Sequence, residues 1–274
     1  MGERVQKVIA NAGLGSRREV EGWIRDGLIL INGQKAKLGD QVGDGEVVAI
    51  NGRRYRTVSG GNRRRVVIYN KPEGEICTRK DPEGRRTVYK SLPRIQRGRW
   101  IAVGRLDINT SGLLLFTNDG ELAHQLMHPS NEVEREYAVR LRGEVLPETR
   151  ERLLAGVELD DGVARFEAMR YMGGEKHNRW YHVVIKEGKN REVRRMWASQ
   201  GVDISRLTRV RYGNVHLPRD LRTGKMRELE PKEISRLSKF AGVLEVDDTQ
   251  YSSSIKLVVE KSRTHRKGKG RSRR

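Results

Sequence analysis

Apolar side chains recur at helical spacing near the start of the chain, at positions 5, 8, 9 and 12. This spacing predicts a short amphipathic helix that ends at Gly13. A second helix is predicted between Ser16 and Gly27, because Ser16 followed by Glu19 has the pattern of a capping box. The apolar face of this second helix would be formed by Val20, Trp23 and Ile24.

A β-hairpin is the clearest short-range signal in the next segment. Residues 28–31 and 34–38 flank the dipeptide Asn32-Gly33, and Asn-Gly favours the type I′ turn that joins two antiparallel strands. Residues 47–50 would add a further strand. We therefore expect a small domain at the start of the chain, without an acid–base pair, metal set or nucleophile cluster of its own.

Short apolar runs that are typical of buried strands begin at residue 66. They cover residues 66–69, 100–103 and 113–116, and turns containing glycine or proline separate them. Asn118 or Asp119 can cap a short helix that His128-Pro129 terminates. From residue 133 to 141 apolar and charged side chains alternate, which predicts a strand with Tyr137 pointing inward.

The rest of this region continues with short strands and helices. The expected elements are a helix between Pro147 and Gly156, a strand at 180–185, a helix capped by Asn190, a strand at 204–210 that places Arg206 and Arg209 among apolar neighbours, and a helix at 231–240. Strands outnumber helices and most connections have hairpin length. We therefore expect an α+β domain built on a mixed, mostly antiparallel sheet with a few flanking helices.

Composition marks the boundaries between the expected domains. Residues 59–64 are rich in glycine, serine and arginine, which predicts a flexible linker between a first domain at 1–58 and a larger domain at 65–245. Residues 246–274 lose apolar periodicity apart from 255–259 and end in a basic, repetitive stretch. They are expected to form a basic tail that is disordered when free and contacts RNA backbone without sequence preference.

Charge points to a polyanionic partner. The chain of 274 residues carries 56 Lys and Arg against 36 Asp and Glu, a formal net charge of +20. The excess is clustered, because residues 53–65 hold six arginines and no acid, and residues 256–274 hold nine basic residues against Glu260 alone. Nucleic acid is therefore the expected partner.

Several other classes of protein are disfavoured. Cys77 is the single cysteine, so an intrachain disulfide or a cysteine-based zinc site is not expected, and a reducing compartment is favoured. His124 and His128 lie four residues apart but lack the glutamate of a metalloprotease motif, so we expect no metal there. No signal peptide and no membrane-spanning run is recognised, which predicts a cytoplasmic protein without membrane contact.

The polar turn between the runs at 100–103 and 113–116 holds the first candidate for chemistry. Its carboxylate, Asp107, lies where the chain leaves one predicted strand and has not yet entered the next, and such rigid strand ends hold reacting groups well. The alternative is that the Asp107 side chain closes an Asx-turn and has no further role. Position and spacing alone favour this second interpretation.

The first domain resembles a known RNA-binding module. Residues 5–20, with the sequence VQKVIANAGLGSRREV, and the later Ile31-Asn-Gly are similar to the S4 domain, a module that grips structured RNA with its helix pair. The resemblance implies RNA binding through basic residues on its polar face. Arg17 and Arg18 are expected at a helix N-terminus that favours phosphate, and Lys35 is expected to join them.

The rest of the chain resembles the RsuA branch of the pseudouridine synthases. The resemblance is carried by ordered motifs: KPEG at 71–74, GRLDINTSGLLL at 104–115, NDG at 118–120, HP at 128–129, EREY at 134–137 and GKNREVRRM at 188–196. Within that branch, residues 70–74 and 81–85 are most similar to members that modify large-subunit ribosomal RNA. The resemblance implies cleavage of the uridine N1–C1′ bond, rotation of the uracil and rejoining through C5, without a cofactor or a metal.

The resemblance also assigns roles to residues of this chain. Asp107 would be the catalytic carboxylate, Arg194 would form its ion pair with Arg191 as the fallback, and Tyr137 would stack on the target base and assist removal of the C5 proton. Arg105 would enter the base stack that the flipped uridine has left, or would contact a phosphate. The further expected RNA contacts are Lys71, Arg191 and Arg195.

Three functions remain open at this point. The expected function is a monomeric pseudouridine synthase that acts on 23S ribosomal RNA or on a large-subunit assembly intermediate. A non-catalytic RNA-binding assembly factor is the alternative from another class, since its charge would be the same. A base-excising glycosylase is the third, and it would release free uracil.

Overall fold

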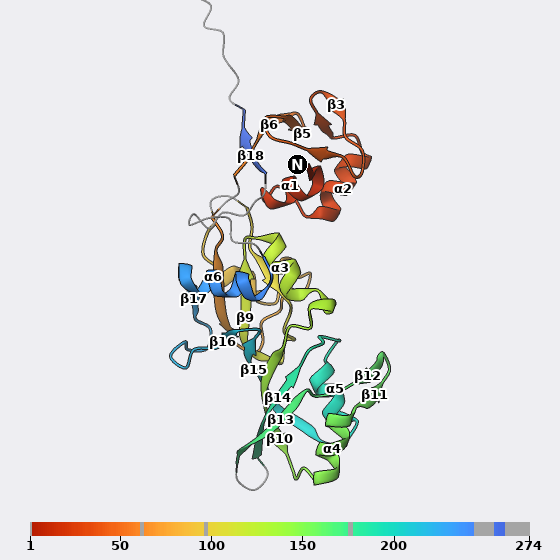
Figure 1. Cartoon of the computed structure of the whole chain (residues 1–274), viewed down its shortest axis with the longest axis vertical. Helices are drawn as coiled ribbons and strands as arrows, with labels where there is room; N and C mark the ends of the chain where they lie inside the picture. The colour runs from red at the N-terminus through yellow and green to blue at the C-terminus, as the bar shows by residue number, and fades with distance from the viewer. Residues whose placement is uncertain (1, 61–62, 96–97, 175–177, 244–254, 261–274) are drawn as a thin grey trace, which may run out of the picture. The chain divides into compact units, whose positions relative to one another are not determined.

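Two compact units make up the chain, which is described by a computed structural model (Figure 1). The structure describes residues 2–60, 63–95, 98–174, 178–243 and 255–260. The first unit comprises residues 1–62 together with the C-terminal residues from 252, and the second unit comprises residues 63–251. Within the described residues, no helix has the length and apolar character needed to cross a membrane.

The first unit is a small α+β domain in which two helices pack on a sheet. Its helices are α1 (Val5–Asn11) and α2 (Arg17–Arg25), and its strands are β1 (Glu3–Arg4), β2 (Ile29–Ile31), β3 (Gln34–Lys35), β4 (Gln41–Val42), β5 (Val47–Ile50), β6 (Arg53–Val58) and β18 (Lys256–Val259). The main sheet has the order β18-β6-β5-β2-β3, and β1 pairs with β4 separately.

Local sequence signals account for the helices and the hairpin of this unit. The Ser16 hydroxyl accepts the N–H of Glu19 at 3.2 Å and the Glu19 carboxylate accepts the N–H of Ser16 at 2.7 Å, so the capping box is complete. Asn32 and Gly33 both have positive φ, at 49° and 88°, as a type I′ turn requires. The predicted helices and hairpin are therefore confirmed.

The expectation of a disordered tail is wrong for residues 256–259. These residues form β18, which extends the first unit's sheet by pairing antiparallel with β6, from Lys256 opposite Val58 to Val259 opposite Tyr55. Ile255 is buried in the core of this unit, and Glu260 forms ion pairs of 2.9 Å with Arg54 and Arg56. The rest of the predicted tail, 246–254 and 261–274, lies outside the described residues.

The second unit is built on a large mixed sheet. Its strands are β7 (Val66–Lys71), β8 (Ile101–Val103), β9 (Ser111–Thr117), β10 (Arg135–Arg142), β11 (Val157–Leu159), β12 (Gly162–Ala164), β13 (Ala168–Gly173), β14 (Asn178–Ile185), β15 (Asp203–Tyr212), β16 (Val215–His216) and β17 (Met226–Glu228). Its helices are α3 (Gly120–Met127), α4 (Pro147–Ala155), α5 (Glu192–Ala198) and α6 (Pro231–Phe240), with the 3-10 helices η1 (Val88–Ser91) and η2 (Pro129–Asn131).

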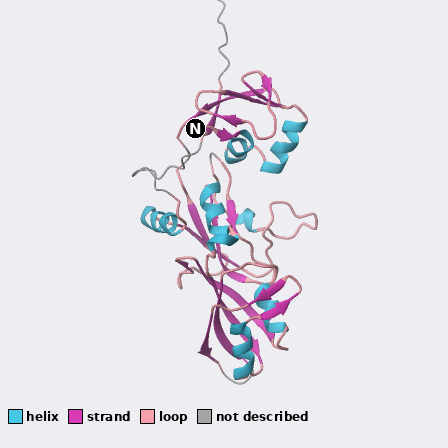
Figure 2. Cartoon of the chain, turned by 45° about the vertical axis from the view of Figure 1, so that its right-hand side comes forward, coloured by secondary structure: helices cyan, strands magenta, loops and turns pink. Residues whose placement is uncertain are grey.

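The sheet runs in the order β13-β14-β10-β15-β9-β7-β17, with β8 paired to β9 and β16 paired to β15. Figure 2 shows the strands in magenta and the helices beside them in cyan. Every pair is antiparallel except β9 with β15, which is parallel and joins the two halves of the sheet. At this junction Gly112 lies opposite Arg209, and a Cβ on Gly112 would clash with the Arg209 carbonyl oxygen. The absence of a side chain therefore lets the two strands approach.

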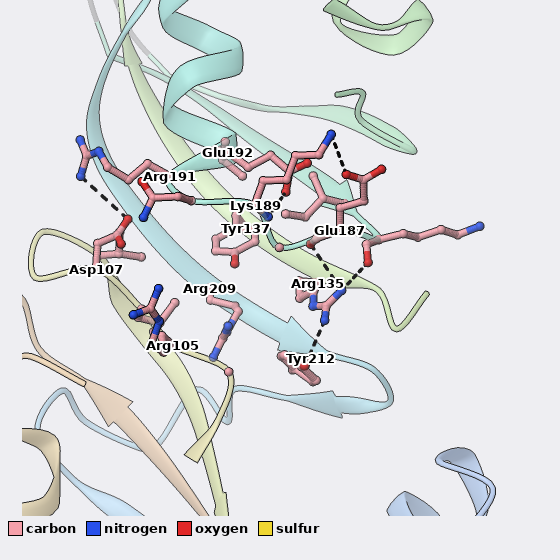
Figure 3. A pocket seen from close by; sticks show the side chains of 18 of the residues that line it. Arg105, Asp107, Arg135, Tyr137, Glu187, Lys189, Arg191, Glu192, Arg209 and Tyr212 are labelled. Carbon is pink, nitrogen blue, oxygen red and sulfur yellow. Dashed lines mark hydrogen bonds and ion pairs between the residues drawn. The ribbon is translucent and has the colours of Figure 1, made fainter. Parts of the chain in front are cut away.

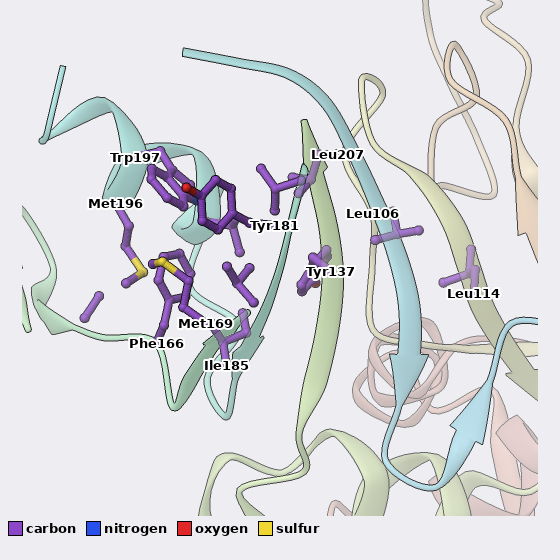
Figure 4. Close-up of a cluster of buried hydrophobic side chains, with 14 of the residues drawn as sticks. Leu106, Leu114, Tyr137, Phe166, Met169, Tyr181, Ile185, Met196, Trp197 and Leu207 are labelled. Carbon is purple, nitrogen blue, oxygen red and sulfur yellow. The ribbon is translucent and has the colours of Figure 1, made fainter. Parts of the chain in front are cut away.

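Helices α4 and α5 pack on one face of strands β10, β14 and β15 through a cluster of buried apolar side chains. Trp197 and Met196 of α5 pack with Phe166 and Tyr181, and the rings of Phe166 and Tyr181 both lie within 6 Å of the Trp197 ring (Figure 4). Tyr137 belongs to the same cluster, so its predicted inward orientation is confirmed. The α+β class and the mostly antiparallel sheet are likewise confirmed.

The prediction of a flexible linker at residues 59–64 is wrong for its last residue, Arg64. Its guanidinium is buried, and it donates 2.7 Å hydrogen bonds to the Asp119 carboxylate and the Ser238 hydroxyl. Asp119 is also the N-cap of α3, where it accepts the N–H groups of Glu121 and Leu122. Arg64 is therefore a fixed part of the second unit, because a buried guanidinium that is paired with a helix cap cannot move freely.

Candidate active site

The turn that carries Asp107 connects β8 to β9. The two strands form an antiparallel pair, and the N–H of Thr110 donates a 3.0 Å hydrogen bond to the main-chain oxygen of Asp107. Among the described residues, the Asp107 carboxylate accepts no hydrogen bond from the main chain of the turn and instead faces Arg191, which contradicts the Asx-turn alternative. The Asp107 side chain is left free for other interactions and is about one-third exposed.

Lys71 holds this turn in place through hydrogen bonds to its main chain. Its side chain is completely buried, and its ammonium donates hydrogen bonds to the main-chain oxygens of Pro72 at 3.0 Å, Asp107 at 3.0 Å and Thr110 at 2.8 Å. Burial lowers the pKa of Lys71. The prediction that Lys71 contacts RNA is wrong, because an ammonium that is buried and bonded to three carbonyls cannot reach a phosphate.

Arg191 faces Asp107 from the opposite wall of the site. It precedes α5 in the left-handed conformation with φ of 48°, and it is the N-cap residue of this helix where Asn190 was predicted. Its Nη1 lies 3.9 Å from Oδ2 of Asp107 (Figure 3). Both side chains are partly exposed, so this long ion pair is weak in water and would strengthen if a ligand covered it.

Arg194 does not form the predicted ion pair with Asp107. Its Nη2 instead donates a 2.7 Å hydrogen bond to the main-chain oxygen of Asn109, two residues after Asp107. Burial, together with the nearby charge of Arg191, lowers the pKa of Arg194. In the described structure the ion pair of Asp107 is formed by Arg191, the fallback residue. Arg191 precedes α5 in the left-handed conformation and its side chain points across the site, whereas Arg194 lies one turn further along the helix.

Tyr137 lies on β10, between β14 and β15, where its neighbours across the sheet are Val183 and Arg209. It is 9% exposed, and its ring reaches the same cleft as Asp107 (Figure 3). A tyrosine on a central strand is held firmly by its neighbours. The site thus has a rigid aromatic wall near the carboxylate.

Further arginines enclose the cleft. Arg105 is exposed at its edge, two residues before Asp107. Arg209 is 2% exposed, donates a 2.7 Å hydrogen bond from Nε to the Leu113 carbonyl, and stacks over the Tyr212 ring with Arg135 on the same ring. The sequence placed Arg209 among apolar neighbours but did not assign it to the site. The available signal was a charged residue at an inward position of an alternating strand.

The cleft has a volume of about 1210 Å³ and brings together most of the predicted site. Asp107, Tyr137, Arg191, Arg194 and Arg105 all line it. Glu192 also lines it, and burial raises the pKa of this carboxyl. Among the described residues, no group of three or more His, Cys, Asp or Glu side chains is arranged to hold a metal ion.

The other predicted RNA contacts lie elsewhere. Arg195 is not among the residues that line the cleft, and its guanidinium binds both oxygens of Asp161 at 2.8 Å. Both side chains are partly exposed, and the RNA contact of Arg195 stays a prediction. Arg17 and Arg18 are exposed at the start of α2 in the first unit, and Lys35 is exposed on β3.

Comparisons with known proteins agree with this arrangement. Residues 65–199 match the RNA pseudouridylate synthase family, and residues 3–48 match the S4 domain. The chain is 56% identical over 245 residues to a ribosomal large subunit pseudouridine synthase B of Pseudomonas aeruginosa, covering 89% of this chain and 64% of that protein. It is 50% identical over 272 residues to the protein of the same name in Yersinia pestis, covering 96% of this chain and 82% of that protein.

A solved structure supports the same assignment. The crystal structure of a pseudouridylate synthase superposes with a TM-score of 0.59 at 26% sequence identity, covering 85% of this chain and 99% of the other. The family match over residues 65–199 includes the turn that presents Asp107. With an S4 domain ahead of its catalytic region, this chain belongs to the RNA pseudouridylate synthase family.

Proposed function

We propose that this chain converts a uridine of large-subunit ribosomal RNA to pseudouridine, with Asp107 as the catalytic carboxylate. The observation that carries the proposal is the cleft in which this carboxylate, held on a fixed turn, meets Tyr137 and Arg191. The substrate is inferred from relatives at 50 to 56% identity whose names specify the ribosomal large subunit.

The target uridine must leave its base stack to reach Asp107, which costs a few kcal/mol. Arg105 is exposed at the edge of the cleft and has a planar guanidinium that can occupy the vacated stack. In the cleft, the flipped uracil would lie against the ring of Tyr137. Covering by RNA would also remove water from the Asp107–Arg191 pair and strengthen it.

The reaction then exchanges one bond to the sugar for another. The uridine N1–C1′ bond breaks, the uracil rotates, a C5–C1′ bond forms, and C5 loses its proton while N1 gains one. Asp107 acts on the sugar or the base as a carboxylate, with the Arg191 guanidinium 3.9 Å away. Tyr137 stacks on the uracil and assists the proton transfer from C5.

Arg194 has a positioning role in this proposal. It donates to the Asn109 carbonyl and Lys71 donates to the Asp107 and Thr110 carbonyls, so the turn is held from two sides. The first unit, through Arg17, Arg18 and Lys35, contributes affinity for the RNA backbone. We propose that the protein acts as a cytoplasmic monomer, on free ribosomal RNA or on an assembly intermediate.

Replacement of Asp107 by Asn tests the proposal, because it removes the charge and keeps the size. We expect pseudouridine formation on a large-subunit RNA transcript to fall by at least about a thousandfold while RNA affinity is kept or rises slightly. Asp220→Asn, at an exposed position outside the cleft, is the control. Full activity of the Asp107 variant would refute the catalytic role, and release of free uracil by the wild type would indicate a glycosylase.

The same experiment addresses the non-catalytic alternative. An assembly factor would bind the transcript with the same affinity in wild type and variant, and neither protein would form pseudouridine. Mapping of pseudouridines in ribosomal RNA from cells with and without the gene would then identify the target uridine.

A further inference from the structure

Among the helices that the structure describes, none covers one face of the sheet formed by β13, β14, β10 and β15. Helices α4 and α5 cover the other face (Figure 1), where the side chains of Tyr137 and Leu207 join the buried cluster (Figure 4). The residues that alternate with this inward set form a surface that we call the open sheet face. Its members are Glu136, Ala138, Arg140, Arg142, Ala168, Arg170, Asn178, Trp180, His182, Val184, Asp203, Arg206, Thr208 and Arg211.

Positive charge dominates the open sheet face. Its five arginines stand against two carboxylates, Glu136 and Asp203. Glu136 is already engaged, because Arg211 binds it at 2.9 Å and His182 lies 2.7 Å from it, while Arg211 also binds Glu134 at 3.0 Å. On the open sheet face, the four remaining arginines are therefore balanced by a single carboxylate, Asp203.

Two of these arginines oppose each other directly. Arg140 of β10 and Arg206 of β15 are partners in the strand register, and like charges in that position destabilise a sheet. Within the described part of the chain, Arg142, Arg170 and Arg206 form no ion pair, and all three are exposed. An anion placed between these groups would relieve the repulsion.

Trp180 adds an aromatic surface to the same face. It lies opposite Arg140 in the register, and the Arg140 guanidinium is 5.9 Å from the centre of its ring. Nε of Arg140 donates to the Ser205 hydroxyl at 2.9 Å, which holds the guanidinium in place. Aromatic and guanidinium planes beside unpaired cations are the combination on which single-stranded bases stack.

We infer that the open sheet face binds a second segment of the RNA substrate. Neighbouring strands lie about 4.8 Å apart, so the arginines extend over roughly 14 Å from β13 to β15, and an RNA strand crossing the sheet passes several of them. Tyr137 and Leu207 line the cleft on the opposite face. The RNA segment in the cleft therefore cannot also cover the open sheet face. A folded RNA would place one segment in the cleft and a second segment on the open sheet face.

The choice of RNA over an acidic protein follows from the composition of the face. A protein interface would need an apolar centre, and this surface offers arginines, one tryptophan and few aliphatic side chains. The inference goes beyond the proposed catalytic function. Its test measures binding, so its failure is separate from any failure of the catalytic proposal.

The test removes the two exposed arginines at the edges of the face. In the variant Arg170→Ala/Arg206→Ala, we expect the affinity for an unmodified full-length large-subunit RNA transcript to fall about five- to tenfold at low salt. The slope of log affinity against log salt should decrease by about 0.7 to 0.9 for each phosphate that the variant no longer neutralises. Arg170→Lys/Arg206→Lys should keep most of the slope, because lysine also binds phosphate.

The control is Arg219→Ala/Arg222→Ala, which removes the same charge from exposed positions between β16 and β17. Thermal unfolding of each variant verifies that the fold is intact. Equal losses in control and test variants would overturn the inference, since a general charge effect would explain them. A second comparison uses the protein without transcript and measures its binding of polyglutamate and of single-stranded RNA. The inference would also be overturned if the protein bound polyglutamate but not single-stranded RNA, and if this binding were lost in Arg170→Ala/Arg206→Ala. The open sheet face would then be a site for an acidic protein.

Discussion

Replacement of Lys71 by Met would release the turn that carries Asp107. The ammonium donates to three main-chain oxygens in a site from which water is excluded. Methionine fills most of the same volume but donates no hydrogen bond. The Asp107 carbonyl keeps the N–H of Thr110, so the loss falls mainly on the Pro72 and Thr110 carbonyls.

The size of the effect follows from these two acceptors. A buried acceptor left unpaired costs about 1 to 3 kcal/mol, so the variant should lose about 2 to 6 kcal/mol of unfolding free energy. Domains of this kind have about 5 to 15 kcal/mol in total. We therefore expect a folded second unit with a loosened turn, and a single-turnover rate of pseudouridine formation that falls more than RNA affinity does.

Urea unfolding and single-turnover kinetics measure the two effects. The urea midpoint should fall with an unchanged slope, and Lys225→Met, at an exposed position on a nearby turn, is the control. The reasoning would be refuted if the variant kept wild-type stability and instead flattened the salt dependence of RNA binding. Lys71 would then contact phosphate, as its sequence motif suggested.

Three further predictions concern stability. Burial raises the pKa of Glu192, so between its unfolded and folded pKa the folded state holds more protons and stability falls as pH rises. Glu192→Gln should therefore gain stability over wild type in urea at pH 7 and lose that gain at pH 4. Burial and a hydrogen bond to Glu75 raise the pKa of Tyr69 to about 12. Tyr69→Phe should remove the last tyrosinate absorbance step, and with it the loss of stability between pH 10 and 12; persistence of that step would assign it to another tyrosine. A chain ending at residue 249 should destabilise the first unit by about 2 to 3 kcal/mol through the lost burial of Ile255, whereas a chain ending at residue 261 should match the full length in calorimetry.

Local signals predicted the elements well because each depends on neighbouring residues. The Ser16–Glu19 capping box and the Asn32-Gly33 turn are set by hydrogen bonds and dihedral angles within a few residues. Alternation along β10 placed Tyr137 inward for the same reason. The parallel pairing of β9 with β15 was not predicted, because it joins segments almost 100 residues apart at Gly112.

The candidate site was predicted in its members but not in its contacts. Asp107, Tyr137 and the arginines around 191–194 line one cleft, yet the partner of Asp107 depends on a single left-handed residue, Arg191, whose φ cannot be read from its side chain. Lys71 was interpreted as an RNA contact because its burial depends on the carbonyls of Asp107 and Thr110, which lie almost 40 residues further along the chain. Such a convergence arises from tertiary structure.

The strand β18 has a consequence for the order in which the chain matures. The first unit's sheet takes its edge strand from Lys256–Val259 and part of its core from Ile255. During synthesis at about 5 to 20 residues per second, the helices and hairpin of this unit emerge first but must wait for almost the whole polypeptide before the sheet is complete. The domain that begins the protein is therefore finished last, after the central sheet has left the ribosome.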